Sequence, residues 1–94
     1  MMDIQELIEA IYEMDKPLLV HITKETYELV QEPGNNRLVR NDFCDGFHDK
    51  EDAIVYLFDA DLFGWSIKSF NWCNSSPSNK VPWWELDITL FKTN

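Results

Sequence analysis

Seven carboxylates stand between Asn41 and Asp61, and Lys50 is the single base among them. This 21-residue segment carries a charge of −6, out of −9 for the whole 94-residue chain. Carboxylates at such density can ligate a cation, exchange protons in hydrolysis or attract a basic partner. Aromatic residues are interleaved with the acids, which predicts that the acids lie on the surface of a folded element. The acids are Asp42, Asp45, Asp49, Glu51, Asp52, Asp59 and Asp61.

The segment fits a metal site poorly. A twelve-residue calcium-loop frame over residues 41–52 places Phe43, which has no oxygen ligand, at its third position. Asp45, His48 and Asp49 could ligate a transition metal, but their spacing matches no recognised motif. We therefore expect no metal and no cofactor.

Signals for catalysis are equally weak. Cys44 has His48 four residues further along, but surrounding carboxylates oppose formation of the thiolate nucleophile. The three glycines of the chain form no Gly-rich phosphate loop. Pairs of carboxylates could be drawn from almost anywhere in this sequence, so they do not identify a hydrolase. We expect that the protein is not an enzyme.

The composition predicts one folded domain over residues 1–94. Hydrophobic residues make up 45% and aromatic residues 14% of the chain, which argues against a disordered acidic tail. No apolar run approaches the roughly 20 residues that cross a bilayer, and the start lacks the basic region of a signal peptide. We therefore expect a cytoplasmic protein, whose negative charge opposes direct binding to nucleic acid or to an anionic membrane.

The first predicted element is an amphipathic helix over residues 3–14. Its apolar residues recur at helical spacing and define one stripe. Glu6, Glu9 and Glu13 lie on the opposite arc, where they form an acidic stripe. Such a stripe is typical of a solvated helix face, and it could also contact a basic partner.

A second helix is predicted to begin at Asp49. Asp49 is a favourable N-cap, Asp52 stands at the third helical position, and Gly64 suits the C-terminal cap. The run over residues 53–58 could instead form a buried strand, but the cap and the early acids favour a helix. Its predicted buried face carries Ala53, Ile54, Leu57 and Phe58.

Five strands are predicted, over residues 17–23, 26–32, 37–43, 65–73 and 83–92. The turn signal at residues 33–36 joins the second and third strands as a hairpin. Residues 44–48 and 74–82 are expected to form loops. The predicted fold is therefore α+β, in the order α-β-β-β-α-β-β. One antiparallel sheet of four to five strands would carry both helices on one face.

Trp83 marks a second candidate surface. Alternation in the last strand directs Trp84 and Leu86 to one side, and Trp83 with Glu85 and Asp87 to the other. An aromatic anchor among acids is typical of a contact with a basic protein surface. Alternatively, the loop over residues 74–82 covers Trp83.

The first residues of the chain resemble those of a known protein family. Met2-Asp3-Ile4-Gln5-Glu6-Leu7-Ile8, followed by Ile11 and Asp15, resembles the opening of small acidic anti-CRISPR proteins of type II-A systems. The resemblance implies an opening helix, a three-stranded sheet and further helical segments. It also implies a DNA mimic that occupies the site where a guide-directed nuclease reads its protospacer-adjacent motif. The Trp-rich strands after Gly64 have no counterpart in that family, and no functional residue carries over.

Two functions follow as hypotheses. The first is a small acidic inhibitor, of phage or mobile-element type, that mimics nucleic-acid charge and occludes the basic groove of a nuclease or similar enzyme. The alternative is a protein–protein adaptor or immunity-type protein that uses the sheet face bearing Trp83, a face that could also form a homo-oligomer. The residues expected to bind the basic partner are Asp45, Asp49, Glu51, Asp52, Asp59 and Asp61, with Glu6, Glu9 and Glu13 as a second stripe.

Overall fold

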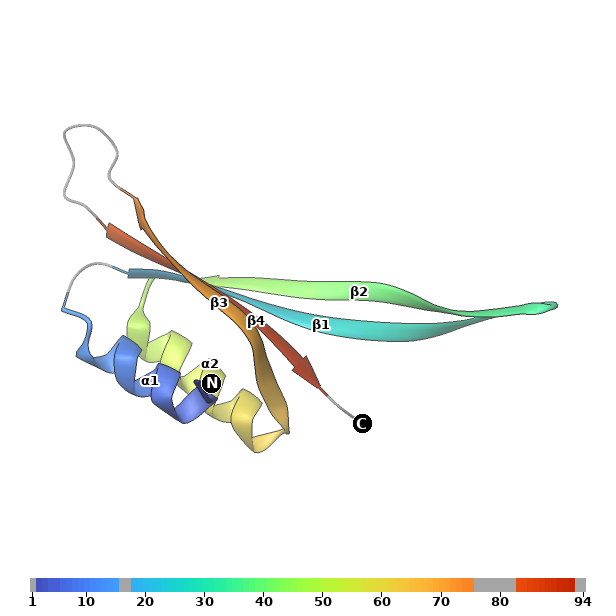
Figure 1. Cartoon of the computed structure of the whole chain (residues 1–94), viewed down its shortest axis with the longest axis horizontal. Coiled ribbons are helices and arrows are strands. Elements are labelled where there is room, and N and C mark those ends of the chain that lie inside the picture. The colour runs from blue at the N-terminus through green and yellow to red at the C-terminus, as the bar shows by residue number, and fades with distance from the viewer. Residues whose placement is uncertain (1, 16–17, 76–82, 93–94) are drawn as a thin grey trace.

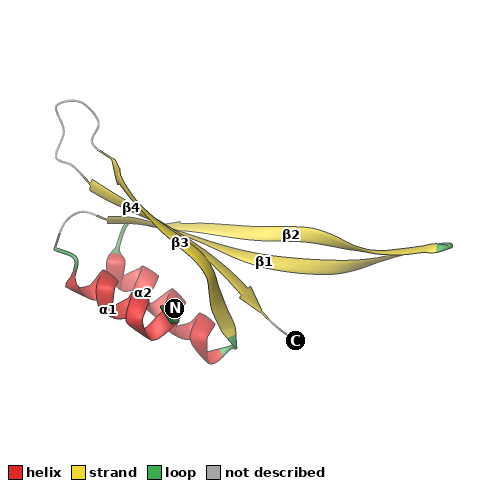
Figure 2. Cartoon of the chain, in the orientation of Figure 1, coloured by secondary structure: helices red, strands yellow, loops and turns green. Residues whose placement is uncertain are grey.

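The structure, a computed structural model, describes residues 2–15, 18–75 and 83–92. Two helices and four strands make up an α+β domain, as expected (Figure 2). Neither helix in this part of the chain is long and apolar enough to cross a membrane. In chain order the elements are α1 (Ile4–Glu13), β1 (Leu18–Glu32), β2 (Asn35–Phe47), α2 (Lys50–Leu62), β3 (Trp65–Ser75) and β4 (Trp83–Lys92).

The four strands form one mixed sheet in the order β2-β1-β4-β3. β1 pairs antiparallel with β2, and β3 pairs antiparallel with β4. The central β1–β4 pair is parallel, where a wholly antiparallel sheet was expected. The reason is that α2 connects one edge strand to the other, so that β4 returns beside β1 in the same direction.

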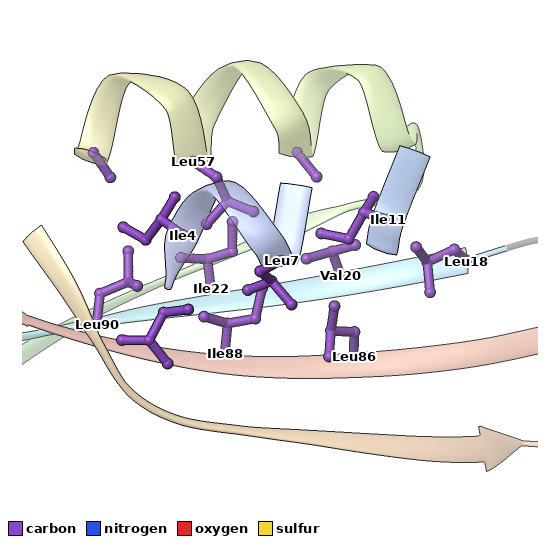
Figure 3. Packing of buried hydrophobic residues seen from close by; sticks show 13 residues of the cluster. Ile4, Leu7, Ile11, Leu18, Val20, Ile22, Leu57, Leu86, Ile88 and Leu90 are labelled. Atoms are coloured by element: carbon purple, nitrogen blue, oxygen red, sulfur yellow. The ribbon is translucent and has the colours of Figure 1, made fainter. Parts of the chain in front are cut away.

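Both helices lie on the same face of the sheet, as predicted (Figure 1). Apolar side chains of α1 and α2 meet alternate residues of β1 and β4 beneath them (Figure 3). The helical spacing in α1 and the alternation in β4 both produced the faces that the sequence predicted. The fully buried side chains of this core include Leu7, Ile11, Val20, Ile22, Leu57, Leu86, Ile88 and Leu90.

Residues 74–75 belong to β3 rather than to the predicted loop over residues 74–82, and residues 76–82 of that loop lie outside the described part of the chain. Two further local predictions were wrong. β1 is a single strand of 15 residues, so the break predicted between residues 23 and 26 does not exist. Residues 44–47 continue β2 rather than forming a loop. The cause is the same in both places, because polar residues interrupt the apolar alternation while their backbones keep pairing, as at Thr23↔Cys44 and Thr26↔Asn41.

The β1–β2 hairpin extends well beyond the rest of the domain (Figure 1). Pairing between β1 and β4 ends at Lys24↔Leu90, so residues 25–42 form a two-stranded ribbon, which we call the arm. The arm gives the molecule its elongated dimensions of 57 × 31 × 22 Å. The predicted turn lies at its tip, where Gly34 adopts a φ of 79°.

Candidate functional site: an acidic helical face

α1 presents its acids to solvent because its apolar stripe is buried against the sheet. Asp3 caps the helix, and its carboxylate accepts a hydrogen bond from the Glu6 backbone amide at 2.8 Å. Ile4, Leu7 and Ile11 are buried on the inner side. Glu6, Glu9 and Glu13 lie on the opposite arc and are exposed, as predicted.

α2 runs antiparallel to α1, and polar contacts join the two helices at both ends. The Gln5 side-chain amide donates to the Asp61 carboxylate at 2.9 Å, next to the C-terminal end of α2. At the other end, Lys50 Nζ donates to the carbonyl oxygens of Tyr12 at 3.0 Å and Met14 at 2.9 Å. Two acidic segments about 40 residues apart in sequence are thereby brought together in one layer.

This layer forms a surface that we call the acidic helical face. Lys50 is the base that belongs to it, and its ammonium group is already held by two backbone carbonyls. The ion pairs of the described residues lie on the sheet, at Glu25, Glu32 and Asp42, and none of them neutralises the helical acids. The acids of this face are Glu6, Glu9, Glu13, Glu51, Asp52, Asp59 and Asp61.

Asp49 and Asp45 have structural contacts at the border of this face. Asp49 is the N-cap of α2, as predicted, and its carboxylate accepts from the Glu51 amide at 2.9 Å. Asp45 stands opposite Ile22 in the ladder, which places it on the helical side of the sheet. Burial of Tyr56, together with hydrogen bonding to Asp45, raises the pKa of Tyr56 to about 12.

Asp42 does not join the acidic helical face. It lies opposite Glu25 in the ladder, on the sheet face away from the helices. Both of its carboxylate oxygens accept from Arg40 Nε at 2.9 Å. The acid-rich segment is therefore divided between two faces of the molecule.

The outer surface of α2 also carries an apolar ridge that the sequence analysis missed. Val55, Phe58 and Leu62 are 60%, 49% and 71% exposed. Their spacing of three and four residues aligns them opposite the buried Ala53 and Leu57. The prediction that Phe58 is buried was therefore wrong. A second apolar set at helical spacing was the available signal, because α2 is apolar on both sides.

For Trp83 the structure describes the backbone alone. Its backbone lies in β4, but its side chain is outside the described residues, so its predicted exposure is untested. Trp65 and Trp72 are half-buried and pack against the core. Trp72 also meets Trp84 edge to face, with ring centroids 6.5 Å apart.

Glu25 is a buried carboxylate that the sequence analysis did not single out. It is 4% exposed, and Lys68 Nζ donates to its two oxygens at 2.7 and 2.8 Å. Arg40 Nη2 lies 3.2 Å from the same carboxylate. Both carboxylate oxygens of Glu25 therefore already have charged partners, so Glu25 is poorly suited to catalysis. Nothing in the sequence signals the pair, since Lys68 stands 43 residues away.

The described residues offer no group of three or more metal-ligating side chains. Comparison of the chain with protein-family models, curated proteins and solved structures gave no match.

Proposed function

We propose that this protein is a small acidic inhibitor that mimics the charge of nucleic acid. It occludes the basic groove of an enzyme that acts on nucleic acid, such as the nuclease of a type II-A CRISPR system or another defence enzyme. The proposal is carried by one observation. Acids of α1 and of α2, which are distant in sequence, lie together on the acidic helical face. Among the described residues, no lysine or arginine of the sheet forms an ion pair with these acids.

Electrostatics gives this face two effects. A concentrated negative field steers a basic groove toward the protein and raises the association rate. The carboxylates then occupy the positions of phosphates and release the counterions of the groove, so binding weakens as salt rises. The stripe from Glu6 to Glu13 spans roughly 10 Å along its helix, which is long enough to contact several basic side chains.

The apolar ridge supplies the second part of the proposed contact. Interfaces commonly have an apolar centre that excludes water and a polar rim that sets orientation. Val55, Phe58 and Leu62 run between the acidic stripe of α1 and the acids Asp52 and Asp59. Such a surface suits a basic groove with an apolar floor, and an inhibitor of this kind acts in the cytoplasm.

The test begins with a tagged pull-down from nuclease-treated lysate of the organism that carries the gene, eluted stepwise with salt. The proposal expects an enzyme that acts on nucleic acid, released at moderate salt, and competition between this protein and duplex DNA for it. E51K/D52K should weaken binding on the order of tenfold. E28K/E32K is the matched control, because it changes the net charge equally on the arm. Equal effects of the two pairs would contradict the site, and a partner unaffected by DNA would contradict the mimicry.

A protein–protein adaptor remains a second candidate. Its support is that no helix of the described chain covers the other face of the sheet (Figure 1). This candidate expects W83A to weaken partner binding more than any acidic substitution, with little dependence on salt. The same pull-down distinguishes the two, since the adaptor complex would survive elution with concentrated salt.

A further inference from the structure

β2 is an edge strand with an unprotected edge. Sheets commonly protect their edges with proline, lysine or a bulge, because free amides and carbonyls otherwise pair with another chain. β3, the opposite edge, has a register shift around Lys68. β2 runs for 13 residues with neither proline nor lysine, and its register with β1 is continuous. Within the described part of the chain, no strand pairs with its outer edge, which is therefore open to a further strand.

The geometry of antiparallel pairing limits how two β2 strands could meet. Successive residues of a strand direct their amide and carbonyl groups to alternate sides, so only every second residue of β2 faces outward. When two identical strands pair antiparallel, two residues that face each other must therefore both have even sequence numbers or both have odd ones. This condition leaves a few registers, each centred on one residue that faces itself.

One of these registers, centred on Asn41, is complementary in both charge and polarity. It places Arg40 opposite Asp42 of the second copy and Arg37 opposite Asp45 of the second copy, each twice by symmetry. The adjacent registers place Arg40 opposite Arg40 or Asp42 opposite Asp42, and like charges in facing positions are unfavourable. In the Asn41 register, Val39 faces Phe43 and Leu38 faces Cys44.

We infer that the protein forms a symmetric homodimer through antiparallel pairing of two β2 strands about Asn41. The pairing joins two sheets into one of eight strands and covers apolar side chains that the isolated arm leaves open. Leu38, Val39 and Phe43 are 68%, 37% and 56% exposed. A two-stranded ribbon is marginally stable in water, and a facing ribbon along roughly 40 Å of strand would stabilise it.

The symmetry has a consequence for the rest of the surface. The two-fold axis of an antiparallel strand pair is normal to the sheet, so both copies carry their helices on the same side. The dimer therefore presents two acidic helical faces in one direction. The dimer does not depend on the proposed function, because it rests on β2 alone.

A disulfide test examines the register directly. Asn41→Cys, in a chain with Cys44 and Cys73 replaced by serine, places two thiols opposite each other at the axis, within disulfide reach. Mild oxidation should convert most of this variant to a covalent dimer. Asn36→Cys in the same background is the control, because its two copies would lie roughly 34 Å apart. Equal cross-linking of the two variants would overturn the register.

Charge reversal tests the same contact without cysteine. R37D alone and D45R alone each replace two attractive pairs by repulsive ones, and each should raise the dimer dissociation constant roughly tenfold. An equimolar mixture should recover the wild-type affinity, because R37D and D45R chains complement each other at both positions. E13R, a matched change on α1, should leave dimerisation unchanged. Sedimentation equilibrium measures wild type, the three variants and the mixture, with circular dichroism to verify folding. A monomeric wild type, or a mixture no tighter than its components, would overturn the inference.

Discussion

Lys68 Nζ lies 2.7 Å from Glu25 Oε1, a contact that connects β3 to β1 across the intervening strand β4. Glu25 is the first residue of β1 beyond the pairing with β4. Its carboxylate is buried, and Arg40 of β2 approaches it from the other side at 3.2 Å. Three strands therefore converge on one carboxylate at the point where the arm leaves the sheet.

Substitution of Lys68 by alanine should destabilise the protein more than loss of an ordinary surface ion pair. The buried Glu25 carboxylate would lose two charged hydrogen bonds, at a cost of about 1–3 kcal/mol in the free energy of unfolding. Urea denaturation measures this difference. Glu32→Ala is the control, because it removes the ion pair between Glu32 and Arg37 without changing β2. Glu32 is 48% exposed at a distance of 3.4 Å from Arg37, and loss of such a pair costs little. Equal losses in the two variants would show that Glu25 needs no charged partner.

Leu57 and Phe58 are neighbours in α2 with opposite environments, 0% and 49% exposed. Leu57→Ala should cost about 2–5 kcal/mol, because it opens a cavity under the helix. Phe58→Ala should cost less than about 1 kcal/mol, because its ring lies on the apolar ridge. Thermal unfolding of the two variants gives the comparison. A larger loss for Phe58 would contradict the orientation of α2 and remove the ridge.

Tyr56 should titrate later than an unperturbed phenol. Its pKa is raised from 10.0 to about 12, first by burial and then by hydrogen bonding to Asp45, because both disfavour the phenolate. The native state thus binds the proton more tightly than the unfolded chain. This contribution to stability is complete below pH 10 and is lost as the pH rises toward 12.

An ultraviolet absorbance titration of the phenols measures this step, and the difference between wild type and Tyr56→Phe isolates it. Asp45→Asn should shift the step to lower pH, because the carboxylate no longer opposes deprotonation. Burial would still hold the pKa above its ordinary value. A Tyr56 step at pH 10 in the wild type would contradict the placement of this side chain.

The tip of the arm depends on Gly34. Its φ of 79° lies in the left-handed region, and Gly34→Ala should cost about 1 kcal/mol although an added Cβ would meet nothing within 4 Å. The loss should appear as faster amide exchange in the arm, with the core amides unchanged. Gly46→Ala is the control, since Gly46 has no positive φ and an added Cβ would lie in ordinary contact, 3.6 Å from the His21 ring. Equal acceleration of arm exchange in both variants would contradict this role for the turn.

Much of the secondary structure could be predicted because it is set by local patterns. The stripe of α1, the cap at Asp49 and the alternation of β4 each involve residues close in sequence, and each prediction was confirmed. The errors occurred where the local sequence pattern disagrees with strand pairing or packing between distant segments. β1 continues through its polar centre because β2 supplies hydrogen bonds there, and Phe58 is exposed because smaller residues fill the inner face of α2.

The sequence by itself determined the negative charge, which follows from composition alone. It also determined the two helices and the single sheet, because hydrophobic periodicity is a pattern of residues close together along the chain. Only the tertiary structure decided which acids share a surface. Glu6 and Asp59 belong to one face because α1 and α2 pack side by side, whereas Asp42, within the same acidic segment, faces the other side of the sheet. The parallel β1–β4 pair and the contact between Glu25 and Lys68 likewise depend on the path of the chain, which no local spacing encodes.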